Sequence, residues 1–219
     1  MTQDHQPSPS ETPLALIGSH RLIPLLTIED ARLAVPLAST LVEAGLPVME
    51  VALSTKAATH AMRDILREVP EAILAAGNVM TAFDLALARE MGVHFAISPG
   101  HSDALLKAAA DNPETPFVPG IATPAELIRV LSAGFHVVKF FPAMAFGGPE
   151  AVRAMMAPFP HARFIPSGGT NEERLDDWLA LPNVVAVGGA WLAPPDEIAK
   201  KDWAAIGKRA RDMLARVKH

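Results

Sequence analysis

The stretch "TPAELIRVLSAGFHVVKFFPAM", Thr123 to Met144, contains a helical pattern and a strand pattern in direct succession. Thr123 is suited to cap the N-terminus of a helix, and Pro124 to occupy its first position. Apolar residues then recur at three- and four-residue spacing as far as Gly134, and glycine commonly ends a helix. The apolar run 136–142 is typical of a buried strand. A helix that leads directly into a buried strand predicts an α/β fold.

The same alternation of apolar runs and helical patterns continues along the chain. The runs begin every 20–26 residues and lie at 21–26, 47–53, 71–77, 93–98, 116–120, 136–142, 162–169 and 183–189. An open doubly wound sheet is the competing layout, but no GxGxxG motif follows a strand. Eight strand–helix units in about 200 residues fit a closed barrel at the short end of its usual length. We therefore predict a compact (β/α)₈ barrel of the TIM type.

The two ends of this arrangement differ in composition. The opening "MTQDHQPSPSETP" is rich in Pro, Ser, Gln and Thr, and it lacks the basic segment and apolar run of a secretory signal. We expect residues 1–13 to form a disordered tail. Residues 14–219 are expected to form a single barrel domain.

The composition narrows the classes of partner. The chain has 219 residues, a net charge of -5 and no cysteine. Mild acidity without a basic run argues against nucleic acid and anionic membranes as partners, and no apolar run reaches the roughly 18 residues of a membrane span. Without cysteine, or histidines at HxH or HExxH spacing, no metal site is expected. The sequence favours a cytoplasmic protein that acts on small molecules without a cofactor.

Lys139 is the residue that the strand pattern does not explain. Side chains alternate along a strand, so Lys139 shares a face with Val137 while Val138 and Phe140 share the other. Burial disfavours the charged form of an amine, and a neutral amine attacks carbonyl carbon to form a Schiff base. The alternative is a structural lysine paired with a carboxylate.

Glu50 is the second such residue, a carboxylate at the centre of the apolar run 47–53. A buried carboxylate suits proton transfer, but it can equally be the ion-pair partner of a buried cation. Lys139 is the obvious partner. A Lys–Glu pair inside a barrel is costly to bury and is found more often at functional sites than in ordinary cores.

Two glycine pairs follow the last two predicted strands. Gly168 and Gly169 come after the seventh, and Gly188 and Gly189 end the eighth. Glycine lets the backbone approach a ligand closely, and the loops after strands 7 and 8 are the recurring phosphate site of such barrels. The two pairs together indicate a phosphate site more strongly than either alone.

Seven motifs in chain order resemble the 2-keto-3-deoxy-6-phosphogluconate and 4-hydroxy-2-oxoglutarate aldolase family. They are "EVALST", "AAGNVM", "FAISPG", "VPGIATPAEL", "VKFFPA", "FIPSGG" and "VGGAWL". The resemblance implies a homotrimeric, class I aldolase of the Entner–Doudoroff pathway, with Lys139 as the Schiff-base lysine and Glu50 as the general acid/base. It also implies substrate contacts from Ser54, Gly77, Asn78, Pro99, Phe141, Ser167, Gly168, Gly169, Gly188, Gly189 and Ala190.

Four of these positions depart from the family pattern. Ser54 stands where the family has an arginine that grips the pyruvate carboxylate, and Asn78 replaces a threonine that touches the same group. Ala190 replaces a serine that helps to hold the phosphate, and Ser167 replaces a threonine. Loss of one charge-assisted hydrogen bond costs about 1.5–3 kcal/mol, or roughly ten- to hundredfold in affinity. The contacts to the substrate carboxylate and to the substrate phosphate are therefore both expected to be weaker.

Three further hypotheses remain beside a phosphogluconate aldolase. The same Schiff-base chemistry can serve a shifted substrate, either another 2-keto acid or a carbonyl compound without a carboxylate. A barrel that binds a metabolite without turnover fits the missing arginine, but it does not need both Lys139 and Glu50. A phosphosugar isomerase or synthase would use the glycine pairs and leave the buried lysine unexplained.

Overall fold

The computed structural model describes residues 12–18 and 20–217. The predicted tail, residues 1–13, lies outside the described residues except for Thr12 and Pro13. Those two residues begin a short helix, α1 (Thr12–Ile17). The prediction for residues 1–11 therefore stays a prediction.

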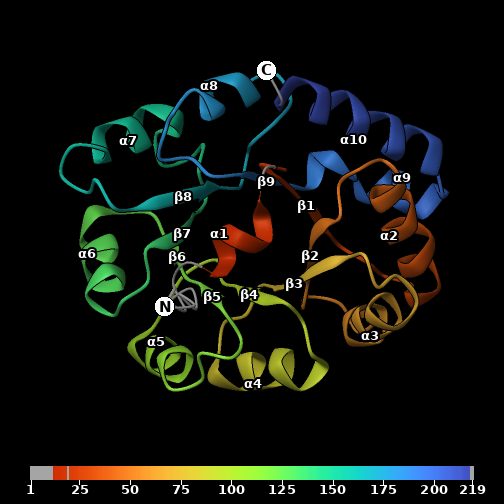
Figure 1. The fold of residues 1–219 in the computed structure, drawn as a ribbon, viewed down its shortest axis with the longest axis horizontal. Helices are drawn as coiled ribbons and strands as arrows, with labels where there is room; N and C mark the ends of the chain where they lie inside the picture. The colour runs from red at the N-terminus through yellow and green to blue at the C-terminus, as the bar shows by residue number, and fades with distance from the viewer. Residues whose placement is uncertain (1–11, 19, 218–219) are drawn as a thin grey trace, which may run out of the picture.

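Parallel strands form a ring at the centre of the molecule (Figure 1). They are β1 (Leu22–Leu26), β2 (Val48–Ala52), β3 (Ile73–Gly77), β4 (Phe95–Ile97), β5 (Phe117–Val118), β6 (Gly120–Ile121), β7 (Val137–Phe140), β8 (Arg163–Pro166) and β9 (Val187–Gly189). One sheet has the order β5-β4-β3-β2-β1-β9, and the other has the order β6-β7-β8.

The two sheets adjoin at two places, which close the ring of strands into a barrel. Pro119 separates β5 from β6, because proline has no N–H to donate to a neighbouring strand. At the other seam, Phe164 of β8 forms a parallel bridge with Val184, just before β9. With β5 and β6 counted as one interrupted strand, the described chain forms a ring with eight positions. The predicted (β/α)₈ class is confirmed.

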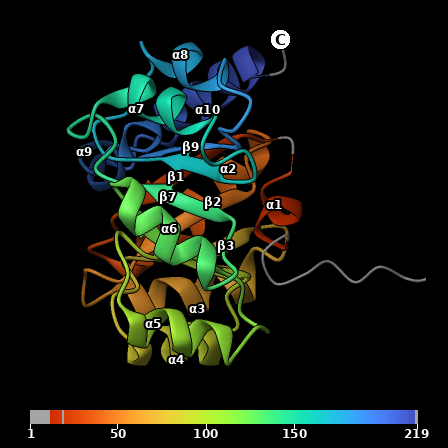
Figure 2. The same ribbon diagram turned by 90° about the vertical axis from the view of Figure 1, so that its left-hand side faces the viewer.

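Helices surround the ring, as Figures 1 and 2 show. They are α2 (Ala34–Glu43), α3 (Ala58–Glu68), α4 (Ala82–Met91), α5 (Asp103–Ala110), α6 (Pro124–Ser132), α7 (Gly148–Met155), α8 (Leu175–Leu179), α9 (Pro195–Lys200) and α10 (Trp203–Val217), with 3₁₀ turns η1 (Ala31–Leu33) and η2 (Ala190–Leu192). Helix α6 begins as predicted, since the Thr123 hydroxyl accepts from the Glu126 N–H and Pro124 occupies its first turn. It ends just before Gly134, whose φ is +90°.

The core has an outer and an inner part. The outer part lies between strands and helices, and it includes the side chains of Val138 and Phe140. The inner part fills the barrel near the N-terminal ends of the strands with residues such as Val48, Phe95 and Val137. Ile17 of α1 packs onto this inner cluster and is fully buried. Helix α1 therefore closes the N-terminal end of the barrel, as Figure 2 shows from the side.

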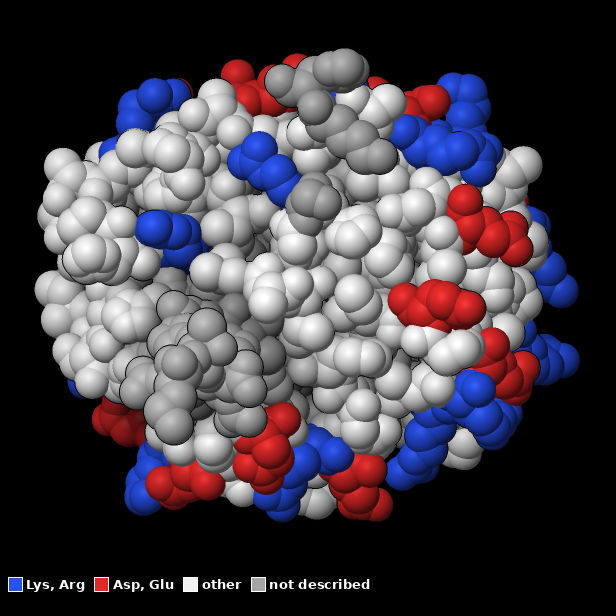
Figure 3. Space-filling model, viewed as in Figure 1, with Lys and Arg blue, Asp and Glu red and all other residues white. Residues whose placement is uncertain are grey.

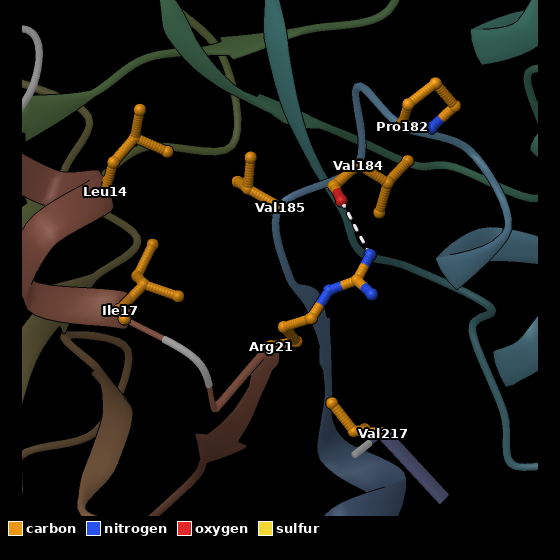
Figure 4. Close-up of a pocket in the computed structure, with 8 residues that line it drawn as sticks. Leu14, Ile17, Arg21, Pro182, Val184, Val185 and Val217 are labelled. Carbon is orange, nitrogen blue, oxygen red and sulfur yellow. Dashed lines mark hydrogen bonds between the residues drawn. The ribbon is translucent and has the colours of Figure 1, made fainter. Parts of the chain in front are cut away.

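The face closed by α1 carries few charges at its centre, and its acidic and basic residues lie mostly toward the rim (Figure 3). A hollow of about 650 Å³ opens there beside α1, lined mainly by apolar residues (Figure 4). Arg21, the one cation among the described residues that line it, donates to the carbonyl oxygens of Leu179 and Val184 at 3.2 and 3.1 Å. The Arg21 guanidinium is therefore already hydrogen-bonded to the backbone of this chain.

Across residues 12–18 and 20–217, no helix is both long and apolar enough to cross a membrane.

Candidate active site

The centre of the barrel holds an ion pair between Lys139 and Glu50. The Lys139 Nζ atom lies 2.9 Å from Glu50 Oε1 and 3.3 Å from Oε2. Each side chain is only 2% exposed. Both charged groups are thus removed from water and depend on one another, which is the arrangement that makes a buried pair costly to break.

Strand geometry explains why these two side chains meet. Glu50 lies on β2 and Lys139 on β7, which stand on opposite walls of the ring. Their neighbours Val48 and Val137 belong to the inner apolar cluster, so alternation directs Glu50 and Lys139 inward as well. They form a layer nearer the C-terminal ends of the strands, which is the end where barrel enzymes carry out their chemistry.

Gly77, at the end of β3, makes room for the Glu50 carboxylate. A Cβ atom at position 77 would lie 2.4 Å from Glu50 Oε1 and 2.6 Å from Glu50 Cγ. Any side chain there would push the carboxylate out of its place beside Lys139. The next residue, Asn78, is half-buried and has a φ of +55°, a conformation that asparagine tolerates better than most residues.

Phe141 and the first glycine pair pack together beside the lysine. Lys139 Nζ lies 5.6 Å from the centroid of the Phe141 ring, within the range of a cation–π contact. A Cβ atom on Gly168 would be 2.9 Å from that ring, and one on Gly169 would be 2.8 Å from Met144 Cβ. Both glycines also have positive φ, at +89° and +77°. The turn after β8 can therefore lie close to Phe141 only because these residues are glycines.

A hydrogen bond links the loops that carry the two glycine pairs. The Thr170 hydroxyl, which follows the first pair, donates to the Gly188 carbonyl at 2.7 Å. Thr170 is buried, as is Ser167 before the pair. Ala190 comes directly after the second pair, opens η2 and is half-buried. The predicted phosphate residues are thus gathered at the C-terminal ends of β8 and β9.

Two other predicted substrate contacts lie on the turns that follow β2 and β4. Ser54 is exposed in the turn after β2, and the neighbouring Thr55 hydroxyl donates to the Ile28 carbonyl at 2.6 Å. Pro99 is half-buried after β4, and its backbone lies against Gly120. A Cβ atom on Gly120 would be 2.2 Å from the carbonyl carbon of Pro99.

Sequence reasoning did not single out three residues that shape this end of the barrel. Gly120 admits the backbone of the turn after β4, His101 forms a hydrogen bond with Gly120, and Thr170 joins the glycine pairs. The Pro-Gly pair inside the run 116–120 was the available signal for Gly120. Nothing in the local sequence marks His101 or Thr170.

The contact between an amine and a carboxylate defines what this centre can do. A carboxylate 2.9 Å from Lys139 Nζ is within reach to accept one of its protons, and the resulting amine is a nucleophile toward a carbonyl carbon. In the described part of the chain, no three His, Asp or Glu side chains gather as metal ligands do.

Known proteins resemble this chain over most of its length. The sequence model of the family "KDPG and KHG aldolase" matches residues 15–209. The KHG/KDPG aldolase of Escherichia coli K12 is 42% identical over 200 residues, which cover 91% of this chain and 93% of that protein. The 2-dehydro-3-deoxy-phosphogluconate aldolase of Pseudoalteromonas atlantica is 42% identical over 89% of this chain and 90% of its own length.

Solved structures agree with these sequence matches. The KDPG aldolase of Legionella pneumophila, with pyruvate captured at low pH as a covalent carbinolamine intermediate, gives a TM-score of 0.88 at 36% identity, covering 91% of this chain and 97% of that one. The enzyme of Zymomonas mobilis ZM4 with 3-phosphoglycerate gives 0.84 at 35% identity, covering 92% and 96%. The resemblance read from the motifs is confirmed, and the chain belongs to the KDPG and KHG aldolase family.

Proposed function

We propose that this protein is a class I aldolase that cleaves and forms the C3–C4 bond of 2-keto-3-deoxy sugar acids such as 2-keto-3-deoxy-6-phosphogluconate, with pyruvate and an aldehyde as products. The observation that carries the proposal is the buried contact between Lys139 and Glu50 at the catalytic end of the barrel. Family membership supports the reaction class, since the relatives bear aldolase names.

The first half of the reaction builds the Schiff base. Glu50 accepts a proton from the Lys139 ammonium, and the free amine adds to the C2 carbonyl carbon of the substrate. The carbinolamine that results loses its hydroxyl as water, after Glu50 returns a proton to that oxygen. A protonated iminium then links C2 to Lys139 Nζ.

The second half breaks the carbon–carbon bond. Glu50 accepts the proton of the C4 hydroxyl as the C3–C4 electron pair moves toward the iminium nitrogen and the aldehyde leaves. Glu50 then returns that proton to C3 of the remaining enamine, and water hydrolyses the iminium to release pyruvate and the free amine. Because the iminium is the electron sink, the chain's own lysine supplies the electrophile.

The remaining site residues are proposed to hold the substrate. Gly168, Gly169, Gly188 and Gly189 would bring backbone N–H groups to the phosphate, with Ser167 and Ala190 beside them. Gly77, Pro99 and Phe141 would shape the space round C2. Ser54 and Asn78 would meet the carboxylate through neutral groups only. The exposed, uncharged Ser54 also favours a second candidate, the same chemistry on a carbonyl compound that has no carboxylate.

The test is reductive trapping. The protein is incubated with pyruvate and borohydride, the intact mass is read, and the adduct is mapped, with Lys139→Met as the matched control. We expect one reduced adduct on Lys139 in the parent protein and none in the variant. An adduct formed only with hydroxyacetone, a ketone that lacks the carboxylate, would favour the second candidate. No adduct with either compound would contradict the proposal.

The proposal includes a homotrimer that works in the cytoplasm on small molecules. This part rests on the family resemblance alone. Size-exclusion chromatography with light scattering tests the assembly, and a mass other than three chains would contradict it.

A further inference from the structure

His101 is placed to hold one wall of the site through the backbone of β6. It follows the turn that connects β4 to α5. Its Nδ1 atom lies 2.9 Å from the carbonyl oxygen of Gly120 on β6. A carbonyl oxygen only accepts, so Nδ1 carries the hydrogen in this bond.

The turn before His101 takes the place of a strand beside β6. Up to residue 118 the barrel is regular, since β4 pairs with β5 and the Ser98 N–H donates to the Val118 carbonyl at 3.0 Å. Beyond the break at Pro119, the Gly120 N–H donates to the Gly100 carbonyl at 3.2 Å. The Gly120 carbonyl accepts from His101. Two hydrogen bonds thus attach the turn to a single residue of β6.

Gly120 also connects this turn to the reactive lysine. On the other side of β6, Gly120 is in register with Lys139 on β7. Residues in register on neighbouring parallel strands direct their side chains to the same face, so a side chain at position 120 would lie beside that of Lys139. The Pro99 carbonyl group occupies that space instead, because a Cβ atom there would be 2.4 Å from its oxygen. The backbone of the turn is therefore the neighbour of the Lys139 side chain.

Packing alone does not hold the turn in this position. A hollow of about 310 Å³ borders it, lined by the turn itself together with Met80 and Leu105. Met80 is 64% exposed, so that side of the turn is open. The turn therefore borders open space and is held by hydrogen bonds, within itself from the Gly100 N–H to Ser98 Oγ at 3.3 Å, and to β6 from His101 to the Gly120 carbonyl.

We infer that His101 is a positioning residue for the Schiff-base reaction, which fixes the Pro99–Gly100 turn against Gly120 and so keeps the wall beside Lys139 in place. This inference rests on the proposed function. A rigid wall holds the carbonyl carbon within reach of the amine, and reaction rates fall steeply when such positions loosen. His101 would therefore act on the rate of the step at bound substrate more than on binding.

The experiment compares His101→Leu, which lacks the donor, with His101→Asn, whose amide can donate from nearly the same place as Nδ1. His161→Leu, a change at an exposed histidine, is the matched control. Borohydride trapping of pyruvate is followed over time at saturating pyruvate, and melting temperature is recorded for every variant. Hydrogen exchange of the peptide 98–105 reports whether the turn has loosened.

We expect His101→Leu to react about five- to tenfold more slowly, the equivalent of one lost hydrogen bond, with faster exchange in 98–105. His101→Asn and His161→Leu should stay within about twofold of the parent rate. A parent rate in His101→Leu, or an equal loss in the leucine and asparagine variants, would overturn the inference while the proposed function stands. A parent protein that gives no adduct would reject the proposed function, and with it a positioning role, even if exchange shows that the turn has loosened.

Discussion

The two ends of the barrel interior are built from the same strands and differ completely in chemistry. At the N-terminal end, Val48 and Val137 belong to a dry cluster that Ile17 of α1 closes. Two residues further along the same strands, Glu50 and Lys139 form a buried ion pair. One end of the barrel is filled by apolar packing, and the other holds a buried pair of charges, which is costly and which we propose is the reactive centre.

The largest effect should come from removing one charge at the polar end. Lys139→Met leaves Glu50 buried without its cation, and breaking a buried pair in this way costs about 3–5 kcal/mol. The double variant Lys139→Met, Glu50→Gln should recover most of that loss, although neither variant should form a Schiff base. Urea denaturation of the two proteins measures the difference. Equal stability of the single and double variants would show that the charges are not coupled as the 2.9 Å contact implies.

The apolar end should respond in the opposite way. Ile17→Ala removes buried methyl groups from the closure of the barrel, so we expect a loss of about 2–4 kcal/mol in the free energy of unfolding. Turnover per folded molecule should stay at the parent value, because the change lies at the opposite end of the barrel from Lys139. Denaturation and steady-state kinetics on the same sample measure both quantities. A clear loss of turnover in the folded protein would show that the two ends are coupled.

A smaller change should affect the polar end without removing any charge. In Gly77→Ala the new methyl group overlaps Glu50 Oε1, so the carboxylate must move relative to Lys139. Overpacking of this kind costs about 1–3 kcal/mol, and we expect kcat/KM to fall by roughly ten- to hundredfold. Gly92→Ala is the control, because position 92 has open space round it, and its φ of +77° adds a backbone strain that position 77 does not have. Similar kinetics in the two variants would contradict the role given to Gly77.

How far the sequence predicted these features depends on whether they are local. Alternation along a strand put Lys139 on the face of Val137, the expected pairing with Glu50 put both inside the barrel, and helix signals predicted Thr123 as the N-cap of α6. The run 116–120 was taken as one strand, whereas Pro119 divides it, because a proline inside a run interrupts the ladder without erasing the apolar pattern. Gly120, His101 and Thr170 act through contacts with distant segments, and no local pattern encodes those contacts.

The smallest effect should come from Glu126, a carboxylate at the same end of the barrel as Glu50 but in a different environment. It accepts from the N–H groups of Ala122 and Thr123, both at 2.8 Å, and from the Thr123 hydroxyl at 2.9 Å. Burial acts to raise the pKa of Glu126, but these hydrogen bonds outweigh it, and the pKa lies below its ordinary value of 4.5. Glu126 thus caps α6 through its Oε2 atom.

A lowered pKa in the folded state means that the ionised form contributes stability above the unfolded pKa, and that this contribution is lost as pH falls through the folded value. Glu126→Gln should therefore lower the free energy of unfolding by less than about 1 kcal/mol at pH 7, since the partly exposed charge is screened. The difference from the parent should shrink as pH falls below 4.5 and through the lowered pKa of Glu126, where the parent takes up its proton. Melting curves from pH 7 to pH 3 follow this, with Glu71→Gln at an exposed position as the control. A difference that persists unchanged at pH 3 would mean that the shape of the side chain, rather than its charge, makes Glu126 a cap.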